Sequence, residues 1–215
     1  MSGAPPEEIS KPRIIGRSSS SFTRVTRIFA AELGVDYELQ VVRDLMSSNA
    51  ADYGGNPALK LPALHTASGT WFGALNVCRA LSHMGTREAR IVWPEALHEP
   101  LLANAQELTV HALATEVALV MSKLGGTAAD SAHQEKMRAS LLNVLSWLDA
   151  NVGAVIAALP SDRDLSYLEV ALFCLVAHLE FRDVLPVRDY RELTAFCQRF
   201  GERASALDTP YRFDP

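Results

Sequence analysis

Four consecutive serines, Ser18 to Ser21, stand where a short apolar segment gives way to a helical pattern. A hydroxyl on such a turn can donate a hydrogen bond to a bound thiolate or carboxylate. Free backbone N–H groups and the positive end of a helix dipole gather at the same place and favour an anion. Serine is also a preferred N-cap and a common loop residue, so the run alone favours a structural role. A functional role for the serines therefore needs support from the neighbouring segments of the sequence.

Four arginines, Arg13, Arg17, Arg24 and Arg27, cluster around this run. They fit an electropositive rim for an acidic ligand. They fit solvation of a helix face and local ion pairing equally well, and both interpretations stay open.

Other chemistry finds little support in the residue spacing. The six histidines show no metal-ligand spacing and no His-Glu-x-x-His, so we expect no metal. Neither a G-x-G-x-x-G nor a P-loop motif occurs. Cys78, Cys174 and Cys197 are far apart and odd in number, which predicts reduced thiols and a cytoplasmic location.

The elements that position the serines form a strand–helix–strand unit. Residues 13–17 predict a strand, and apolar residues at three- and four-residue spacing predict a helix from Phe22 to Leu33. Gly34 stops the helix in the C′ position. Residues 36–42 alternate like a second strand. The serines therefore lie at the turn from the first strand into the helix N-terminus.

A small α/β unit follows from the next segments. Pro62 suits the first residue of a strand, and the Leu61–Pro62 bond is left open as cis or trans. Ser68-Gly69 predicts a turn and residues 69–72 a strand, so a hairpin is expected. Residues 73–84 predict a helix. We expect a mixed sheet, with Trp71 and Phe72 in its core.

The rest of the chain predicts helices and no strand. Two long helices over 96–124 and 129–157 are joined at Gly125-Gly126. A third, apolar nearly all round, spans 167–181, and a last one spans about 189–205. Ser166 as N-cap and Glu169 at N3 form a predicted capping box for the third helix.

Bulk properties narrow the function classes. The chain has 215 residues, a formal net charge of −5 and 21% charged residues. This argues weakly against nucleic-acid binding, which needs a basic face. No stretch reaches the ~18 uninterrupted apolar residues of a membrane span, so we expect no membrane. Residues 1–11 are polar and rich in proline, and are expected to form a flexible leader.

Four stretches together resemble the cytosolic glutathione transferase family. Ser20-Ser21-Phe22-Thr23-Arg24 resembles its Ser-Pro-Phe-x-Arg or Cys-Pro-Phe-x-Arg turn. Asn56-Pro57 with Lys60-Leu61-Pro62-Ala63-Leu64 resembles its Asn-Pro…Lys-Val-Pro-x-Leu segment, which has a cis-proline. Leu75 to Leu81 resembles the helix after the fourth strand. Ser166 to Asp183 resembles the family's capping box and buried helix.

The resemblance covers about residues 12–214 and implies a fold and an activity. The fold would be an α/β thioredoxin-like N-terminal domain at 12–85, a linker at 86–94 and an all-α C-terminal helical bundle at 95–215. The activity would be that of a glutathione transferase, an enzyme of detoxification: the thiolate of bound glutathione, a co-substrate, attacks a small hydrophobic electrophile. Family members are usually homodimers, so a homodimer is implied.

Residue by residue, Ser20 falls at the family's catalytic Ser/Cys position, with Ser18, Ser19 and Ser21 as rivals because the register of a serine run is uncertain. Its hydroxyl would stabilise the glutathione thiolate and lower the thiol pKa. The resemblance also implies a set of residues for binding glutathione and a pocket for the second substrate. The former are Lys60, Leu61, Pro62, Gly73, Ala74 and Asn76, and the latter are Glu107, His111 and Thr115. These last three share a helix face at four-residue spacing, which favours a solvated or interface-facing stripe over a polar pocket lining.

One departure weakens the implied glutathione site. The family has Glu-Ser or Asp-Ser at the start of the helix after the fourth strand, and Gly73-Ala74 stands there. Losing these contacts removes roughly 2–5 kcal/mol of binding free energy, or about 30- to several-thousand-fold in affinity. Amides at the helix N-terminus, Asn76, Arg17 or Lys60 are possible replacements. The alternatives are a non-catalytic binding protein on the same scaffold, or a site for a different acidic ligand or thiol.

Overall fold

The computed structural model describes residues 11–126 and 131–215, and divides the chain into two compact units. Unit 1 comprises the chain up to Arg87 together with Arg212–Pro215. Unit 2 comprises Glu88–Tyr211. The predicted flexible leader falls almost wholly outside the described residues, as do the first two residues of the predicted helix at 129–157.

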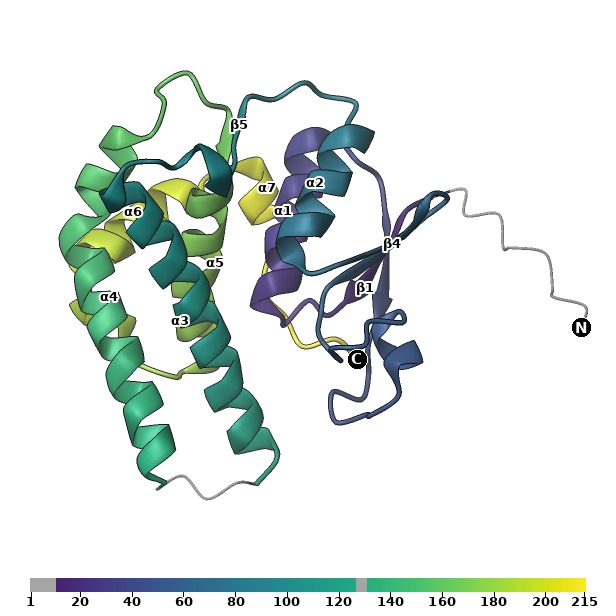
Figure 1. Cartoon of the computed structure of the whole chain (residues 1–215), viewed down its shortest axis with the longest axis horizontal. Helices are drawn as coiled ribbons and strands as arrows, with labels where there is room; N and C mark the ends of the chain where they lie inside the picture. Colours follow the sequence, from purple (N-terminus) through teal and green to yellow (C-terminus); the bar gives the residue numbers. More distant parts are fainter. Residues whose placement is uncertain (1–10, 127–130) are drawn as a thin grey trace, which may run out of the picture. The chain divides into compact units, whose positions relative to one another are not determined.

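Unit 1 is a four-stranded mixed sheet with two helices (Figure 1). The strand order is β2-β1-β3-β4, with β1 parallel to β2 and antiparallel to β3, and β3 antiparallel to β4. The strands are β1 (Arg13–Gly16), β2 (Glu38–Val41), β3 (Ala63–Thr66) and β4 (Gly69–Phe72). The predicted mixed α/β arrangement is therefore confirmed.

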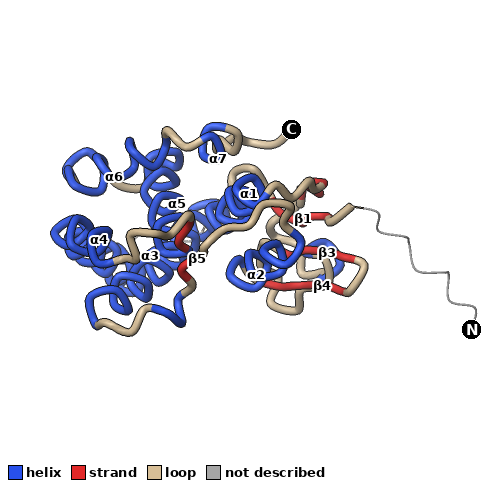
Figure 2. Tube along the Cα trace, turned by 90° about the horizontal axis from the view of Figure 1, so that it is seen from above, coloured by secondary structure: helices blue, strands red, loops and turns tan. Residues whose placement is uncertain are grey.

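Helices α1 (Ser21–Leu33) and α2 (Ala74–Met84) pack against each other on one face of this sheet (Figure 2). Apolar side chains of β1, Ile14 and Ile15, are fully buried. Gly34 ends α1 at a φ of 67°, as predicted, a left-handed conformation that glycine adopts without a steric penalty. The prediction that Trp71 lies in the core is wrong: it is 41% exposed, because β4 is an edge strand.

Unit 2 is built mainly of helices. They are α3 (Pro100–Leu124), α4 (Ala132–Ala158), α5 (Tyr167–Arg182), α6 (Arg191–Gly201) and α7 (Ala204–Leu207). The single helix predicted at 189–205 is thus two helices, separated at Glu202 and Arg203. The expectation of no strand is also wrong, since β5 (Ile91–Val92) pairs in parallel with β6 (Leu165–Ser166). The described part of the chain also contains short 3₁₀ turns at η1 (Ala50–Tyr53), η2 (Pro94–Ala96) and η3 (Val187–Asp189).

The long helices pack as a bundle. Helix α3 contacts α4 and α5, and α4 contacts α6. Among the described helices, α4 alone has the length and apolar composition needed to cross a membrane. One such helix is weak evidence, because it rests on length and composition only, and α4 buries Leu141, Leu145 and Leu148 in the bundle.

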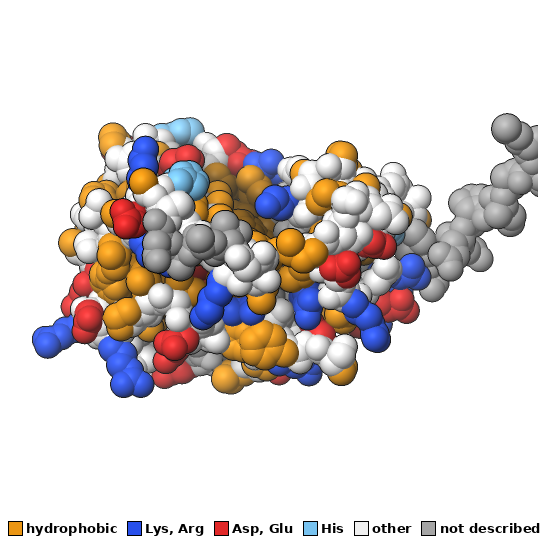
Figure 3. Space-filling model, turned by 90° about the horizontal axis from the view of Figure 1, so that it is seen from below, with side chains coloured by type: hydrophobic (Ala, Val, Ile, Leu, Met, Phe, Trp, Pro, Cys, Tyr) orange, Lys and Arg blue, Asp and Glu red, His pale blue; other side chains and the backbone are white. Residues whose placement is uncertain are grey.

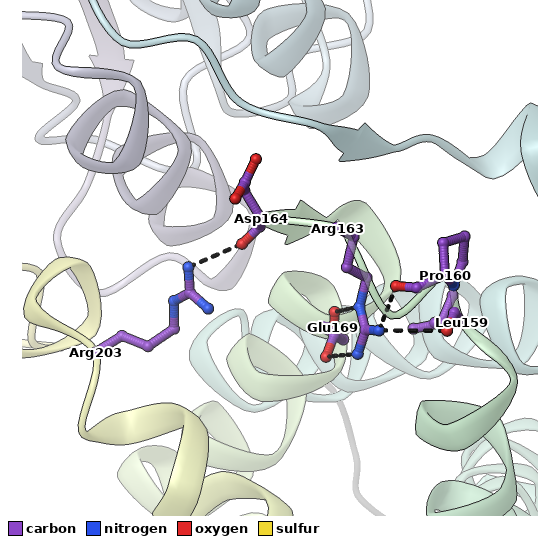
Figure 4. Close-up of polar contacts among 6 residues, drawn as sticks. All are labelled: Leu159, Pro160, Arg163, Asp164, Glu169 and Arg203. Carbon is purple, nitrogen blue, oxygen red and sulfur yellow. Dashed lines mark hydrogen bonds and ion pairs between the residues drawn. The ribbon is translucent and has the colours of Figure 1, made fainter.

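The capping box predicted for α5 is not formed. Ser166 is the N-cap, but its buried hydroxyl has no hydrogen-bond partner in the described part of the chain. Instead, both oxygens of Glu169 accept hydrogen bonds from Arg163, at 2.7 and 2.8 Å (Figure 4). Arg163 also donates to the carbonyls of Leu159 and Pro160. A guanidinium competes successfully with the cap because a bidentate ion pair is stronger than a neutral hydrogen bond.

Candidate functional site

The serine run forms a tight turn between β1 and α1. The amide of Ser20 donates to the carbonyl of Arg17 at 3.1 Å, and the amide of Arg17 donates to Thr23 Oγ1 at 3.4 Å. Gly16 permits this closure, because a Cβ there would lie 2.5 Å from the Thr23 side chain. The end of β1 and the first turn of α1 are therefore linked by a hydrogen bond to the Thr23 side chain, and the absence of a side chain at Gly16 leaves room for this close approach.

Ser20 is the N-cap of α1. It has extended backbone dihedrals, and its Oγ accepts a hydrogen bond from the amide of Thr23 at 3.3 Å. A serine hydroxyl carries one donor and two acceptor positions, so this bond leaves the hydroxyl proton for a partner outside the helix. The side chain is half-buried. Ser20 can thus offer a hydrogen-bond donor at the positive end of the helix dipole.

The three rival serines are more deeply placed. Ser18, Ser19 and Ser21 are all buried, with at most 2% of their surface exposed. The hydroxyls of Ser18 and Ser21 have no hydrogen-bond partner among the described residues. Burial removes these three side chains from a ligand that approaches through solvent, which favours Ser20.

The Leu61–Pro62 segment lies beside this turn. Its peptide bond is cis, as the resemblance implied. Asn56 orders the preceding loop, because its side chain donates to the carbonyl of Lys60 and accepts from the amide of Ala58. In the sheet Ile15 is paired with Ala63, so the residues after β1 and those before β3 share one end of the sheet.

The start of α2 lies at the same end, since Ala63 is paired with Phe72. The amide of Gly73 donates to the carbonyl of Pro62 at 3.1 Å. The first intrahelical bond runs from Val77 to Gly73, which leaves the amides of residues 74–76 at the helix N-terminus. The structure thus brings Ser20, Leu61–Pro62 and Gly73-Ala74 to one edge of unit 1.

Gly73 itself has a φ of 82° and makes no side-chain cap. The side-chain amide of Asn76 donates from Nδ2 to the carbonyl of Phe72 at 3.1 Å, so it links α2 to β4. Lys60 is exposed at the loop.

Three of the clustered arginines have local partners. Arg13 pairs with Glu38, and Arg17 donates to the carbonyl of Arg43. Arg27 donates to the hydroxyl of Tyr37. These contacts favour local pairing over an electropositive rim for an acidic ligand.

The predicted second-substrate residues lie on α3. His111 Nε2 is 3.2 Å from Ser140 Oγ of α4 and 3.4 Å from Thr115 Oγ1. Thr115 is buried and Glu107 is exposed. The contacts of His111 join α3 to α4, and a role in binding a second substrate stays a prediction.

Sequence reasoning missed one residue at the turn. Asp214 Oδ2 accepts a hydrogen bond of 2.7 Å from the amide of Ser18. Nothing in the local sequence marks this acid, because its partner lies 196 residues away along the chain.

Within residues 11–126 and 131–215, no group of three His, Cys, Asp or Glu side chains is suited to hold a metal ion. On the visible face of each unit, acidic and basic side chains are interspersed (Figure 3). No field of a single sign covers that face.

The chain is similar to known proteins through one family model and through the folds of solved structures. Residues 19–84 match the family model of the glutathione S-transferase N-terminal domain. A search of curated proteins gives no match.

Solved structures match nearly the whole chain. A glutathione S-transferase from Methylobacillus flagellatus KT with GSH bound is 21% identical, with a TM-score of 0.73, over 94% of this chain and 100% of that chain. A glutathione transferase family member from Pseudomonas fluorescens Pf-5 with bound glutathione is 19% identical, with a TM-score of 0.73 and the same coverage. A glutathione S-transferase from Methylobacterium radiotolerans JCM 2831, in complex with glutathione sulfonate, is 18% identical over 96% of this chain and 98% of that chain, with a TM-score of 0.71. At these identities the likeness shows the fold.

Proposed function

We propose that this chain, which carries the N-terminal domain of the glutathione S-transferase family and has the fold of those enzymes, binds glutathione and activates its thiol. The observation that carries the proposal is the state of Ser20. Its hydroxyl oxygen caps α1 through Thr23, while its proton stays available to a ligand. Two of the solved structures with the same fold hold bound glutathione.

The residues of unit 1 have separate roles in this proposal. The Ser20 hydroxyl donates a hydrogen bond to the glutathione sulfur, and the N-terminus of α1 adds a favourable field. Both favour the thiolate over the thiol and so lower the thiol pKa. The backbone of Leu61, before the cis Pro62, binds the cysteinyl part of glutathione. The amides of residues 74–76 receive the γ-glutamyl carboxylate in place of the missing acid–hydroxyl pair.

The reaction then needs no base on the protein. The thiol proton passes to solvent, and the sulfur lone pair forms a bond to an electrophilic carbon while the leaving group departs with its electron pair. The second substrate would be a small hydrophobic electrophile. We expect a cytoplasmic homodimer.

Calorimetric titration of the full-length protein with glutathione tests the proposal. Micromolar to low-millimolar affinity is expected, together with a lowered pKa of the bound thiol, measured from the ultraviolet absorbance of the thiolate. Ser20→Ala should weaken binding about tenfold or raise the thiol pKa, and Ser20→Thr should retain both properties because it keeps the hydroxyl.

Ser131→Ala is the matched control. Ser131 is the N-cap of α4 and its Oγ accepts from the amide of Gln134 at 3.2 Å, so the substitution removes an equivalent cap in unit 2. It should leave glutathione binding unchanged. If the wild-type protein shows no heat of binding at several millimolar glutathione, glutathione-dependent catalysis is excluded.

A non-catalytic binding protein is the second candidate. It is favoured by Gly73-Ala74, which supplies neither a carboxylate nor a hydroxyl to a γ-glutamyl group. An absence of glutathione binding in the same titration would support it.

A further inference from the structure

The amide of Ser18 is a donor that the serine turn cannot satisfy by itself. Ser18 is fully buried, and it lies between Arg17 and Ser20, whose own bond closes the turn. A buried N–H without an acceptor is costly, so its partner matters for the shape of the turn. That partner is the carboxylate of Asp214: the amide nitrogen of Ser18 donates to Asp214 Oδ2 over 2.7 Å.

Three other amides of this turn and of the first turn of α1 have acceptors close by in the sequence. Arg17 donates to Thr23, Ser20 to Arg17, and Thr23 to Ser20. The bond to Asp214 instead joins the turn to the last residues of the chain, and Arg212–Pro215 belong to unit 1 although Tyr211 belongs to unit 2. The end of the chain is thereby part of the unit that contains the candidate site.

We infer that Asp214 is a positioning residue for the glutathione thiol. This inference rests on the proposed function. The carboxylate fixes the backbone two residues before Ser20, and so fixes where the Ser20 hydroxyl points. It also places a negative charge on the turn that receives a thiolate, and a like charge raises a thiol pKa. Asp214 therefore acts through a hydrogen bond that helps binding and a charge that opposes ionisation.

Two substitutions in the full-length protein separate these effects. Asp214→Asn keeps an oxygen acceptor for the Ser18 amide and removes the charge. Asp214→Ala removes both. The turn also carries Arg17, and the first turn of α1 carries Arg24. Both arginines are unchanged in the two variants, so a difference in the thiol pKa is due to Asp214. Asp208→Asn and Asp208→Ala are controls, because Asp208 is an exposed acid near the same end of the chain.

The measurements are the dissociation constant of glutathione and the pH at which the thiol of bound glutathione ionises. Asp214→Asn should bind glutathione within about threefold of the wild type and ionise its thiol at a lower pH. Asp214→Ala should bind about tenfold more weakly and hold a smaller thiolate fraction than Asp214→Asn. If Asp214 only stabilised the fold, neither substitution would shift the pH at which the thiol of bound glutathione ionises.

The inference is overturned if Asp214→Ala matches Asp208→Ala in both measurements, or if Asp214→Asn is as impaired as Asp214→Ala. Both outcomes require that the wild-type protein binds glutathione. An absence of binding by the wild type refutes the proposed function instead, so the two failures are distinguishable. Circular dichroism of each variant shows whether it is folded.

Discussion

The Ser20 hydroxyl of unit 1 and the Arg163–Glu169 pair of unit 2 differ in how far their hydrogen-bonding groups are satisfied. At the turn, Ser20 is half-buried and keeps its hydroxyl proton for an outside partner. In unit 2, Arg163 and Glu169 are each only 15% exposed and satisfy one another, and Glu116 pairs with His178 at 2.7 Å. The half-buried Ser20 hydroxyl can still donate to a ligand, whereas Arg163 and Glu169 satisfy each other and form a structural contact.

The largest effect on stability should come from Glu169→Ala. The change leaves a largely buried guanidinium without its bidentate partner, which should lower the free energy of unfolding by about 2–3 kcal/mol. Urea unfolding followed by circular dichroism measures it. Asp162→Ala is the matched control: it breaks an ion pair of similar length, 2.8 Å, to Arg90, but both side chains are about two-thirds exposed. It should cost less than about 0.5 kcal/mol. Equal losses in the two variants would show that burial does not distinguish these pairs.

The Glu116–His178 pair predicts a pH dependence. Burial raises the pKa of Glu116 above its ordinary value of 4.5, against the opposing effects of His178 and Arg182. The folded protein thus keeps the Glu116 proton to higher pH than the unfolded chain does. The resulting stability is present below pH 4.5 and is lost as the pH rises through the raised pKa.

Glu116→Gln tests this pH dependence. The glutamine oxygen can still accept from His178 Nδ1, which Arg182 favours by donating to His178 Nε2. The free energy of unfolding of the wild type, minus that of the variant, should fall as the pH rises above 4.5 and through the raised pKa of Glu116. A difference that is constant with pH, or that rises, would contradict the prediction. The pH series uses urea unfolding at constant ionic strength.

Local parts of the site were predictable from sequence, and distant ones were not. Helical spacing and the serine run located Ser20, because an N-cap and its helix are adjacent in the chain. The capping box at Ser166 was predicted wrongly, because a motif of four residues does not show that Arg163 competes for Glu169. Asp214 was missed because its partner is at the other end of the chain. The strands β5 and β6 were missed because each has only two residues and their partners are remote.

Two glycines should respond to alanine with opposite signs. Gly73→Ala should lower the free energy of unfolding by about 1 kcal/mol, since the φ of 82° at Gly73 disfavours a side chain. No atom lies within 4 Å of the added Cβ, so backbone strain is the whole cost. Gly153→Ala in the exposed face of α4 also meets no atom, and should stabilise by about 0.5–1 kcal/mol through helix propensity. Thermal unfolding measures both, and a destabilised Gly153→Ala would contradict the assignment of an unstrained helical position.

The smallest effect on stability should come from Ser166→Ala. Comparing it with Ser131→Ala distinguishes an N-cap serine whose hydroxyl makes no hydrogen bond from one whose hydroxyl accepts a hydrogen bond from the helix. Ser131→Ala removes a hydrogen bond to the amide of Gln134, and should cost about 1 kcal/mol. Ser166 occupies the same N-cap position in α5, yet its hydroxyl is buried and makes no hydrogen bond among the described residues. Removing an unpaired buried hydroxyl abolishes no bond and relieves a desolvation cost, so stability should change by less than about 0.5 kcal/mol or should increase. Urea unfolding of the two variants compares them directly. A loss at Ser166 as large as that at Ser131 would mean that the hydroxyl caps α5 in solution, and that Arg163 does not replace it.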